Sequence, residues 1–392
     1  MKRIGLNTDE GRHAAWLELF LDLVYVVALA RLTHIVVEGH NGHVEPRDYL
    51  IFFVLFVPAW WSWVGHTMYA NRFGTYDITD RLLTLLQMFF AVMLALGITD
   101  ALGETRAIFA LAYAATRWTI ILMYARIYFG NPDARPVAGG LIVGFSIGSS
   151  LWAVSVLFPP PIMFTLWFVG IVIELATPLS IRKELKLLPV HSTHLPERVG
   201  LFALLVLGES IQGLASGASN LALSLPVILN LFLAFSVICL VWWLYFETLE
   251  KTLTGHLKGA AQLCIYGHLP IYMGIVLLAA GVQKLVSADH STDELNLIFS
   301  FSFLLILMPL QLIHYQYIDK SERTWFLKRG VLIVASILTF FVAGQYIGNT
   351  FLVLLIIIML VVYTHSESTF IARELKNSKP KPDASNPVKQ YR

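Results

Sequence analysis

Residues 16–37 read WLELFLDLVYVVALARLTHIVV, an almost continuous apolar run of the length that a membrane helix needs. About 20 such residues cross the roughly 30 Å hydrocarbon core of a bilayer. Similar runs recur along the whole chain, over roughly 49–70, 81–99, 105–129, 137–157, 162–181, 198–219, 222–248, 256–284, 294–317, 326–346 and 349–371. The sequence therefore predicts an all-α polytopic membrane protein with about twelve transmembrane helices.

The composition of the chain agrees with this fold class. Of its 392 residues, 57% are hydrophobic and 14% are charged, whereas a soluble domain is about 25% charged. The net charge of +2 provides no long basic face, so no nucleic-acid partner is expected. The two cysteines, Cys239 and Cys264, lie inside apolar runs, which argues against a disulfide framework and a cysteine-based zinc site. Membrane lipid is the expected surrounding.

Basic residues alternate between the predicted loops. With twelve spans, 23 of the 28 Lys and Arg residues fall on the side that carries both termini. The opposite loops contain only Arg47, Arg106 and Lys284. Since basic residues near membrane segments stay in the cytoplasm, we expect a bacterial inner-membrane protein with both termini cytoplasmic.

Weak self-similarity predicts two parallel six-helix repeats. Glu18 and Glu197 open the first and seventh runs, and the pair Trp60-Trp61 recurs as Trp242-Trp243. A parallel repeat places a pseudo-twofold axis along the membrane normal, with a site or pathway between the halves. The expected organisation is a cytoplasmic N-terminus (1–15), a first membrane half (16–181), a cytoplasmic linker (182–197), a second half (198–371) and a disordered cytoplasmic tail (372–392).

Ionisable residues within the first span need partners, because each costs roughly 2.5–3.5 kcal/mol in the hydrocarbon. Glu18, Asp22 and Tyr25 share one helix face, and Arg31 and His34 form a second patch further along. Asp22 and Arg31 point in opposite directions, so other helices must supply their partners. These groups either lock neighbouring helices together or take part in function.

The seventh span carries a polar stripe that begins near the bilayer midplane. Glu209 lies twelve residues beyond Glu197, about 18 Å along a helix. Gln212 and Ser216 follow on the same face, and Ser210 is adjacent. We interpret the stripe as one wall of a hydrated cavity, with an interhelical hydrogen-bond cluster as the alternative.

Other polar groups at depth include His66 and Arg117. Arg117 needs an acidic or carbonyl partner, which either Glu209 or Glu174 can supply. The segment before the seventh span places His191, His194 and Glu197 three residues apart, but Pro196 and the lack of a fourth ligand disfavour a metal site. No cofactor is expected. Asp80 is expected to cap the third span.

Three segments resemble the bacterial low temperature requirement protein A (LtrA) family: WLELFLDLVYVVALARLTH (16–34), WWSWVGHTMYANRF (60–73) with DRLLTLLQM (80–88), and HLPERVGLFALLVLGESI (194–211). The resemblance implies a multi-pass bacterial inner-membrane protein linked by name to growth in the cold, without a settled biochemical activity. A fold-level analogy extends to otopetrin proton channels, which also have two six-helix halves. By motif, the residues of interest are Glu18, Asp22, Arg31, His34, His66, Asn71, Arg72, Arg81, Gln87, Glu197, Arg198, Glu209 and Ser210.

Three functions compete on these observations. The favoured one is a transporter or channel for a small solute or ion, with proton coupling plausible from acids and histidines at several depths. The alternatives are a structural or regulatory membrane factor and an intramembrane enzyme acting on a lipid-like substrate. Whether the chain forms a homo-oligomer is left open. The pathway candidates are Glu18, Asp22, Arg31, His34, His66, Arg72, Arg81, Gln87, Arg117, Glu174, Glu197, Arg198, Glu209, Ser210 and Gln212.

Overall fold

The computed structural model describes residues 13–39, 43–74, 77–253, 261–287, 291–315, 323–344, 346 and 353–363. Within these ranges the regular elements are helices: α1 (Trp16–Glu38), α2 (Pro46–Phe73), α3 (Ile78–Ile98), α4 (Arg106–Gly130), the 3-10 turn η1 (Pro132–Ala134), α5 (Arg135–Ser155), α6 (Pro160–Ser180), α7 (Arg182–Leu185), α8 (His194–Ala218), α9 (Leu225–Leu253), α10 (Ala261–Ser287), α11 (Thr292–Tyr315) and α12 (Arg323–Gly344). The predicted tail 372–392 and most of the N-terminus 1–15 lie outside the described residues.

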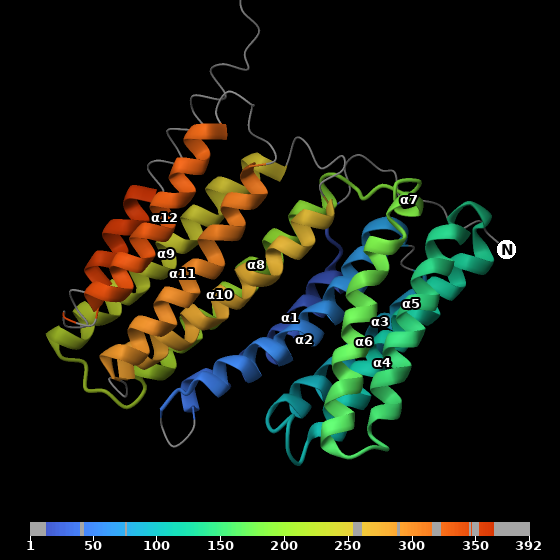
Figure 1. Ribbon diagram of the computed structural model, residues 1–392, viewed down its shortest axis with the longest axis horizontal. Helices are drawn as coiled ribbons and strands as arrows, with labels where there is room; N and C mark the ends of the chain where they lie inside the picture. The colour runs from blue at the N-terminus through green and yellow to red at the C-terminus, as the bar shows by residue number, and fades with distance from the viewer. Residues whose placement is uncertain are drawn as a thin grey trace, which may run out of the picture.

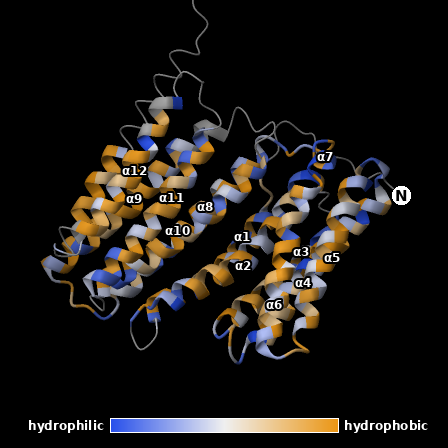
Figure 2. Cartoon of the chain, in the orientation of Figure 1, coloured by the Kyte–Doolittle hydropathy of each residue, from blue (hydrophilic) through white to orange (hydrophobic). Residues whose placement is uncertain are grey.

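In the described part of the chain, ten helices are long and apolar enough to cross a membrane. Two shorter apolar helices, Arg329–Val342 within α12 and Val353–Tyr363, lie within the last two predicted spans, 326–346 and 349–371. Figure 2 shows hydrophobic residues along the middle of the long helices. The prediction of an all-helical, multi-pass membrane protein is confirmed, whereas the count of twelve spans stays a prediction.

The helices form two groups that meet along a central seam (Figure 1). In the first half α3, α4, α5 and α6 pack in chain order, and in the second half α10 packs against α8 and α11. Helices α1 and α2 of the first half contact α8 and α10 of the second. Groups on the facing sides of these four helices are therefore placed at the contact between the halves.

Local capping explains where three of the helices begin. The Glu18 carboxylate accepts a hydrogen bond from the backbone N–H of Ala15 at 3.2 Å, at the start of α1. At the start of α3, the side chain of Asp77 accepts from the backbone N–H of Asp80 at 2.8 Å. The expectation that Asp80 caps this helix is wrong, because Asp77 is the capping residue and Asp80 lies in the first turn. Pro46 opens α2, where its missing N–H has no cost.

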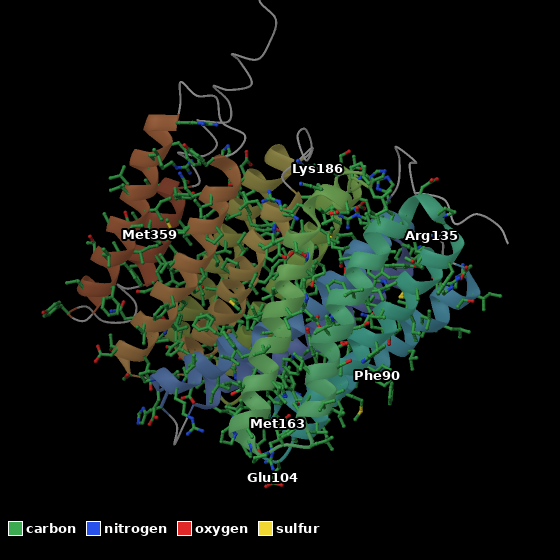
Figure 3. The ribbon with its side chains drawn as sticks, turned by 45° about the vertical axis from the view of Figure 1, so that its right-hand side comes forward. Phe90, Glu104, Arg135, Met163, Lys186 and Met359 are labelled. Atoms are coloured by element: carbon green, nitrogen blue, oxygen red, sulfur yellow. The ribbon has the colours of Figure 1, made fainter. Side chains whose placement is uncertain are left out.

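The two ends of the helix bundle differ in the residues that they carry. Arg135 and Lys186 lie at one end, hereafter the basic end, and Glu104 and Met163 lie at the other, hereafter the opposite end (Figure 3). This separation agrees with the alternation of basic loops in the sequence.

The tryptophan pairs that suggested a repeat lie in different surroundings. Trp60 and Trp61 are buried, with 1% and 2% exposed. Trp242 and Trp243 are 48% and 53% exposed on α9. The pairs therefore do not mark equivalent positions in two superposable halves, and the repeat stays a prediction.

Candidate functional site

A buried histidine–carboxylate pair joins the first helices of the two halves at the basic end. Nε2 of His194, in the first turn of α8, lies 3.0 Å from Oε2 of Glu18 on α1. Both side chains are almost fully buried. Because α1 and α8 lead the two halves, this contact ties the halves together.

The neighbouring Asn71 determines the tautomer of His194. The Asn71 side-chain oxygen accepts the backbone N–H of His191 at 2.9 Å, so its nitrogen is the atom that faces the His194 ring. That nitrogen lies 3.1 Å from Nδ1 of His194 and donates to it. Nδ1 is thus an acceptor, and the proton of neutral His194 resides on Nε2, directed at Glu18.

One turn further along both helices, Asp22 pairs with Arg198. The two guanidinium Nη atoms donate to the two carboxylate oxygens at 2.5 and 2.6 Å, in a bidentate pair with both side chains fully buried. The indole N–H of Trp63, from α2, also donates to Asp22 at 2.7 Å. Nε of Arg198 lies 3.8 Å from Oε2 of Glu18, which joins the two pairs into one group.

We call Glu18, Asp22, His194 and Arg198 the inter-half cluster. Among the described residues it holds two carboxylates and one permanently charged guanidinium, with His194 as the titratable fourth member. A buried charge that lacks compensation costs several kcal/mol. Because the cluster places a histidine directly beside a carboxylate, it is chemically suited to bind and release a proton.

A row of hydrogen-bonded polar side chains lies beside this cluster. Nδ1 of His66 donates to the side-chain oxygen of Gln87 at 2.8 Å, linking α2 to α3. The Gln87 amide nitrogen reaches the hydroxyl of Tyr25 at 3.5 Å, which is at the limit of a hydrogen bond. Tyr25 follows Glu18 and Asp22 on the same face of α1, and all three are buried.

Arg117 forms a separate ion pair inside the first half. Its partner is Glu174 of α6, with Nε 2.5 Å from Oε2, and Glu209 is not involved. The hydroxyl of Tyr113 donates to the same carboxylate oxygen at 2.9 Å. The Arg117 guanidinium also stacks on the Phe145 ring, 4.2 Å from its centroid. A Cβ at Gly65 would collide with this guanidinium, so only glycine leaves room for it.

The opposite end carries another polar contact between the halves. Oε1 of Glu294, at the start of α11, accepts from the backbone N–H of Val44 at 3.0 Å and lies 3.1 Å from Nδ1 of His43. Lys284 of α10 lies 3.9 Å from the other carboxylate oxygen. We call this the outer contact. The halves are therefore joined by polar groups near both ends of their seam.

Asp77 and Asp80 at the start of α3 pair with Arg126 of α4. Burial alone would raise the pKa of Asp77, but hydrogen bonds from the backbone N–H of Asp80 and from Arg126 outweigh it. The pKa of Asp77 is accordingly lowered from its ordinary value. This group holds α3 to α4 at the basic end.

Several predicted site residues lie outside these clusters. Arg31 and His34 are on the exposed face of α1, where His34 pairs with Glu38 at 3.7 Å. Arg81 is exposed. Glu197 is partly exposed and lies 3.4 Å from His13. These residues do not join the polar groups at the seam.

The polar stripe of α8 also lies away from the inter-half cluster. Glu209 is half-buried and makes no hydrogen bond or ion pair within the described chain. Ser210 is buried with no partner for its hydroxyl, while Gln212 is exposed and bonds to Ser216 at 3.3 Å. The proposed wall of a hydrated cavity is thus placed on the margin of the exposed face of α8.

Sequence reasoning missed some members of the site. Trp63 lies within the motif that drew attention to Trp60 and Trp61, yet only the helix packing shows that its N–H reaches Asp22. Tyr113 was missed for the same reason, since an aromatic residue in an apolar run gives no sign of a polar partner. In the described ranges, no group of three or more His, Cys, Asp or Glu side chains is arranged to hold a metal ion.

Comparison with known proteins places these motifs in a family. The model of the bacterial low temperature requirement A protein (LtrA) family matches residues 13–364. An uncharacterized protein of Rhizobium meliloti (strain 1021) is 29% identical over 309 residues, covering 74% of this chain and 73% of the relative. The match therefore includes all of the described clusters.

Proposed function

Because the chain belongs to the LtrA family, we propose that this family member is a transporter or channel for a small solute or ion, with transport coupled to protons. The observation that carries the proposal is the inter-half cluster of Glu18, Asp22, His194 and Arg198, buried at the contact between the two halves. Ionisable residues at depth in a membrane protein mark ion and proton pathways more often than other functions.

The energetics of buried ion pairs favours a role of the cluster in transport over a role only in holding α1 against α8. A buried ion pair contributes little net stability, because desolvation of the two charges offsets their attraction. Apolar side chains of similar volume would hold α1 against α8 equally well or better. A cluster with a titratable histidine is useful where the seam opens and its groups meet water or a permeating ion.

The position of the polar contacts supports a rocking motion between halves. The inter-half cluster lies at the basic end and the outer contact of Glu294 with His43 and Val44 lies at the opposite end. In alternating access, one half moves against the other around a site near the membrane centre. Breaking one polar contact while keeping the other would open the seam from one side only.

For the whole chain we propose twelve spans in the bacterial inner membrane, with both termini cytoplasmic and the two halves as parallel repeats. The ten long apolar helices and the two shorter ones at the end support the count. The concentration of Lys and Arg at the basic end supports the orientation.

A structural or regulatory role is the second candidate, and one observation favours it. Asp22 with Arg198, and Glu174 with Arg117, are fully buried pairs of good geometry. Such pairs also specify which helices pack together. In that case the cluster would matter for assembly and have no effect on flux once the protein has folded.

Flux through the purified protein tests the proposal. The full-length chain is reconstituted into vesicles that contain a pH-sensitive dye, and gradients of protons, cations, anions and small solutes are applied in turn. We expect proton movement with at least one gradient. His194→Gln keeps a donor towards Glu18 but cannot bind a proton, so its flux should fall and lose its dependence on pH between about 5 and 8.

His34→Gln is the matched control, because His34 is an exposed histidine on α1. It should leave flux and pH dependence unchanged. If no gradient moves protons or solute in the wild type, or if His194→Gln behaves like wild type, the proton-coupled transport proposal fails.

A further inference from the structure

A small, partly open cavity lies between the halves, apart from the inter-half cluster. Its volume is about 60 Å³. Its walls come from both halves and include Trp61, Arg72, Tyr124 and Phe145 from the first half, with Gln262 and Tyr266 from α10 of the second. Any molecule held there touches both parts of the protein.

Arg72 is the charged group in the cavity wall. Only 7% of the residue is exposed. Its Nε donates to the backbone oxygen of Leu188 at 3.1 Å, and Nη1 reaches the backbone oxygen of Met68 at 3.5 Å. A guanidinium has five N–H donors, so most of them are left for another acceptor.

Two other buried arginines provide an internal comparison. Arg117 pairs with Glu174, and Arg198 pairs with Asp22. In the described residues no carboxylate lies within ion-pair distance of Arg72, and both of its acceptors are neutral carbonyls. A buried positive charge without an anion is costly, and an anionic ligand at this point would offset that cost.

Two other polar side chains of the wall, Gln262 and Tyr266, are already engaged, whereas the buried indole N–H of Trp61 has no hydrogen-bond partner among the described residues. The Gln262 amide donates to the backbone oxygen of Pro178 at 3.0 Å, and the Tyr266 hydroxyl donates to that of Leu175 at 2.8 Å. The rest of the surface is aromatic and aliphatic, from residues such as Trp61 and Phe145. The cavity therefore combines one guanidinium with apolar walls.

We propose that this cavity binds a small monocarboxylate, with the carboxylate paired to Arg72 and a short apolar body against Trp61 and Phe145. A planar carboxylate matches the fork of a guanidinium, which gives two parallel hydrogen bonds. The volume of about 60 Å³ exceeds the roughly 10–15 Å³ that admits one water molecule and is below the roughly 150 Å³ of a cavity that holds benzene, which limits the ligand to a few heavy atoms.

The walls also select against other anions. A phosphate dianion would bring more charge than one guanidinium balances, into a surface with few other donors. A long fatty acid would exceed the volume. Whether the bound carboxylate is also a transport substrate rests on the proposed function. Binding itself does not, because it is measured without a membrane gradient.

Thermal unfolding of the full-length protein in detergent tests binding. Sodium formate, acetate, propionate and hexanoate are compared with phosphate and chloride, at an ionic strength held constant with the larger anion gluconate. A ligand that binds only the folded state raises the melting temperature with its concentration. We expect acetate and its nearest homologues to stabilise most, with smaller effects from hexanoate, phosphate and chloride.

Two variants locate the site. Arg72→Gln should weaken acetate binding at least about tenfold, whereas Arg135→Gln, at an exposed arginine that stacks on Tyr128, should not change it. Leu141→Phe fills the cavity from its apolar wall and should also abolish binding, which decides the question if Arg72→Gln fails to fold. Equal acetate binding by wild type and the Leu141→Phe variant, or equal stabilisation by chloride and acetate, would overturn the proposal.

Flux measurements separate this proposal from the proposed function. Carboxylate binding without any flux would support the carboxylate site and contradict the proposed transport function. If carboxylates do not bind, and neither carboxylates nor Arg72→Gln alter proton flux, the carboxylate site is contradicted and the transport function is still supported.

Discussion

The carboxylate of Asp22 and the guanidinium of Arg198 form two hydrogen bonds, of 2.5 and 2.6 Å, across the contact between the halves of the protein. The two residues are 176 positions apart in the chain. A bidentate pair fixes both the distance and the relative orientation of α1 and α8. The pair thus couples the geometry of the seam to the charge state of the residues around it.

Changes at this pair separate stability from function. Asp22→Asn leaves a buried guanidinium without its counter-ion and should lower the free energy of unfolding by about 3–5 kcal/mol. The double change Asp22→Leu with Arg198→Met removes both charges and should restore most of that loss. Thermal unfolding in detergent measures both effects. If the cluster takes part in transport, the stable double variant has no flux, and normal flux would instead support the structural role.

Glu209 can be tested with two substitutions of different chemistry. If it lines the transport pathway, Glu209→Gln should preserve the melting temperature while flux or its pH dependence falls sharply. If it only packs, the Gln variant should stay active, and Glu209→Leu should not lower the melting temperature, because Glu209 makes no hydrogen bond or ion pair within the described chain. Normal flux in a stable Gln variant would exclude Glu209 from the mechanism.

The lowered pKa of Asp77 predicts that part of the folding stability depends on pH. Its pKa is lowered in the folded protein, so its charge stabilises the fold above the ordinary carboxyl pKa, and this contribution is lost as the pH falls through the folded value. Asp77→Asn should therefore cost less than about 1 kcal/mol at neutral pH, because the pair with Arg126 is partly exposed. The difference from wild type in thermal unfolding should shrink as the pH falls below the ordinary carboxyl pKa and vanish once it is below the lowered pKa of Asp77.

A helix-cap control distinguishes the charge of Asp77 from its hydrogen bond. Asn retains an oxygen that accepts the backbone N–H of Asp80, whereas Ala does not. Asp77→Ala should add a loss of about 1 kcal/mol that does not change with pH. A difference between Asn and wild type that is constant across pH would contradict the assignment.

The orientation in the membrane is accessible to cysteine labelling. In a background with Cys239→Ser and Cys264→Ser, single cysteines are placed at Glu104 and Lys186, which lie at opposite ends of the bundle (Figure 3). A membrane-impermeant maleimide should label the Glu104→Cys protein in intact cells and the Lys186→Cys protein only after permeabilisation. Labelling of both from the same side would contradict the topology.

Much of the fold was predictable because a bilayer restricts the chain to helices of one length. The apolar runs therefore translate directly into elements, and ten of the predicted runs overlap α1, α2, α3, α4, α5, α6, α8, α9, α10 and α11 closely. The capping of α3 was less predictable, because Asp77 and Asp80 both have suitable side chains and only the backbone position of Asp77 makes it the cap.

From the sequence, the site could be predicted only as a set of residues whose burial in the hydrocarbon costs free energy. Asp22 and Arg198 stood out because each is expensive in hydrocarbon, yet nothing in a single sequence indicates which charge meets which. Arg117 illustrates the ambiguity, since Glu174 and Glu209 were both acceptable partners and the structure selects Glu174. Arg31 stood out for the same reason but lies on the exposed face of α1.

What the sequence determined by itself was the membrane class, the approximate spans and the side on which basic residues gather, because these depend on local hydrophobicity and charge. The pairing of Asp22 with Arg198, the tautomer of His194 and the isolation of Arg72 in its cavity were decided only by the tertiary structure. Each depends on how helices from distant parts of the chain cross, and that geometry is set by the packing of many side chains at once.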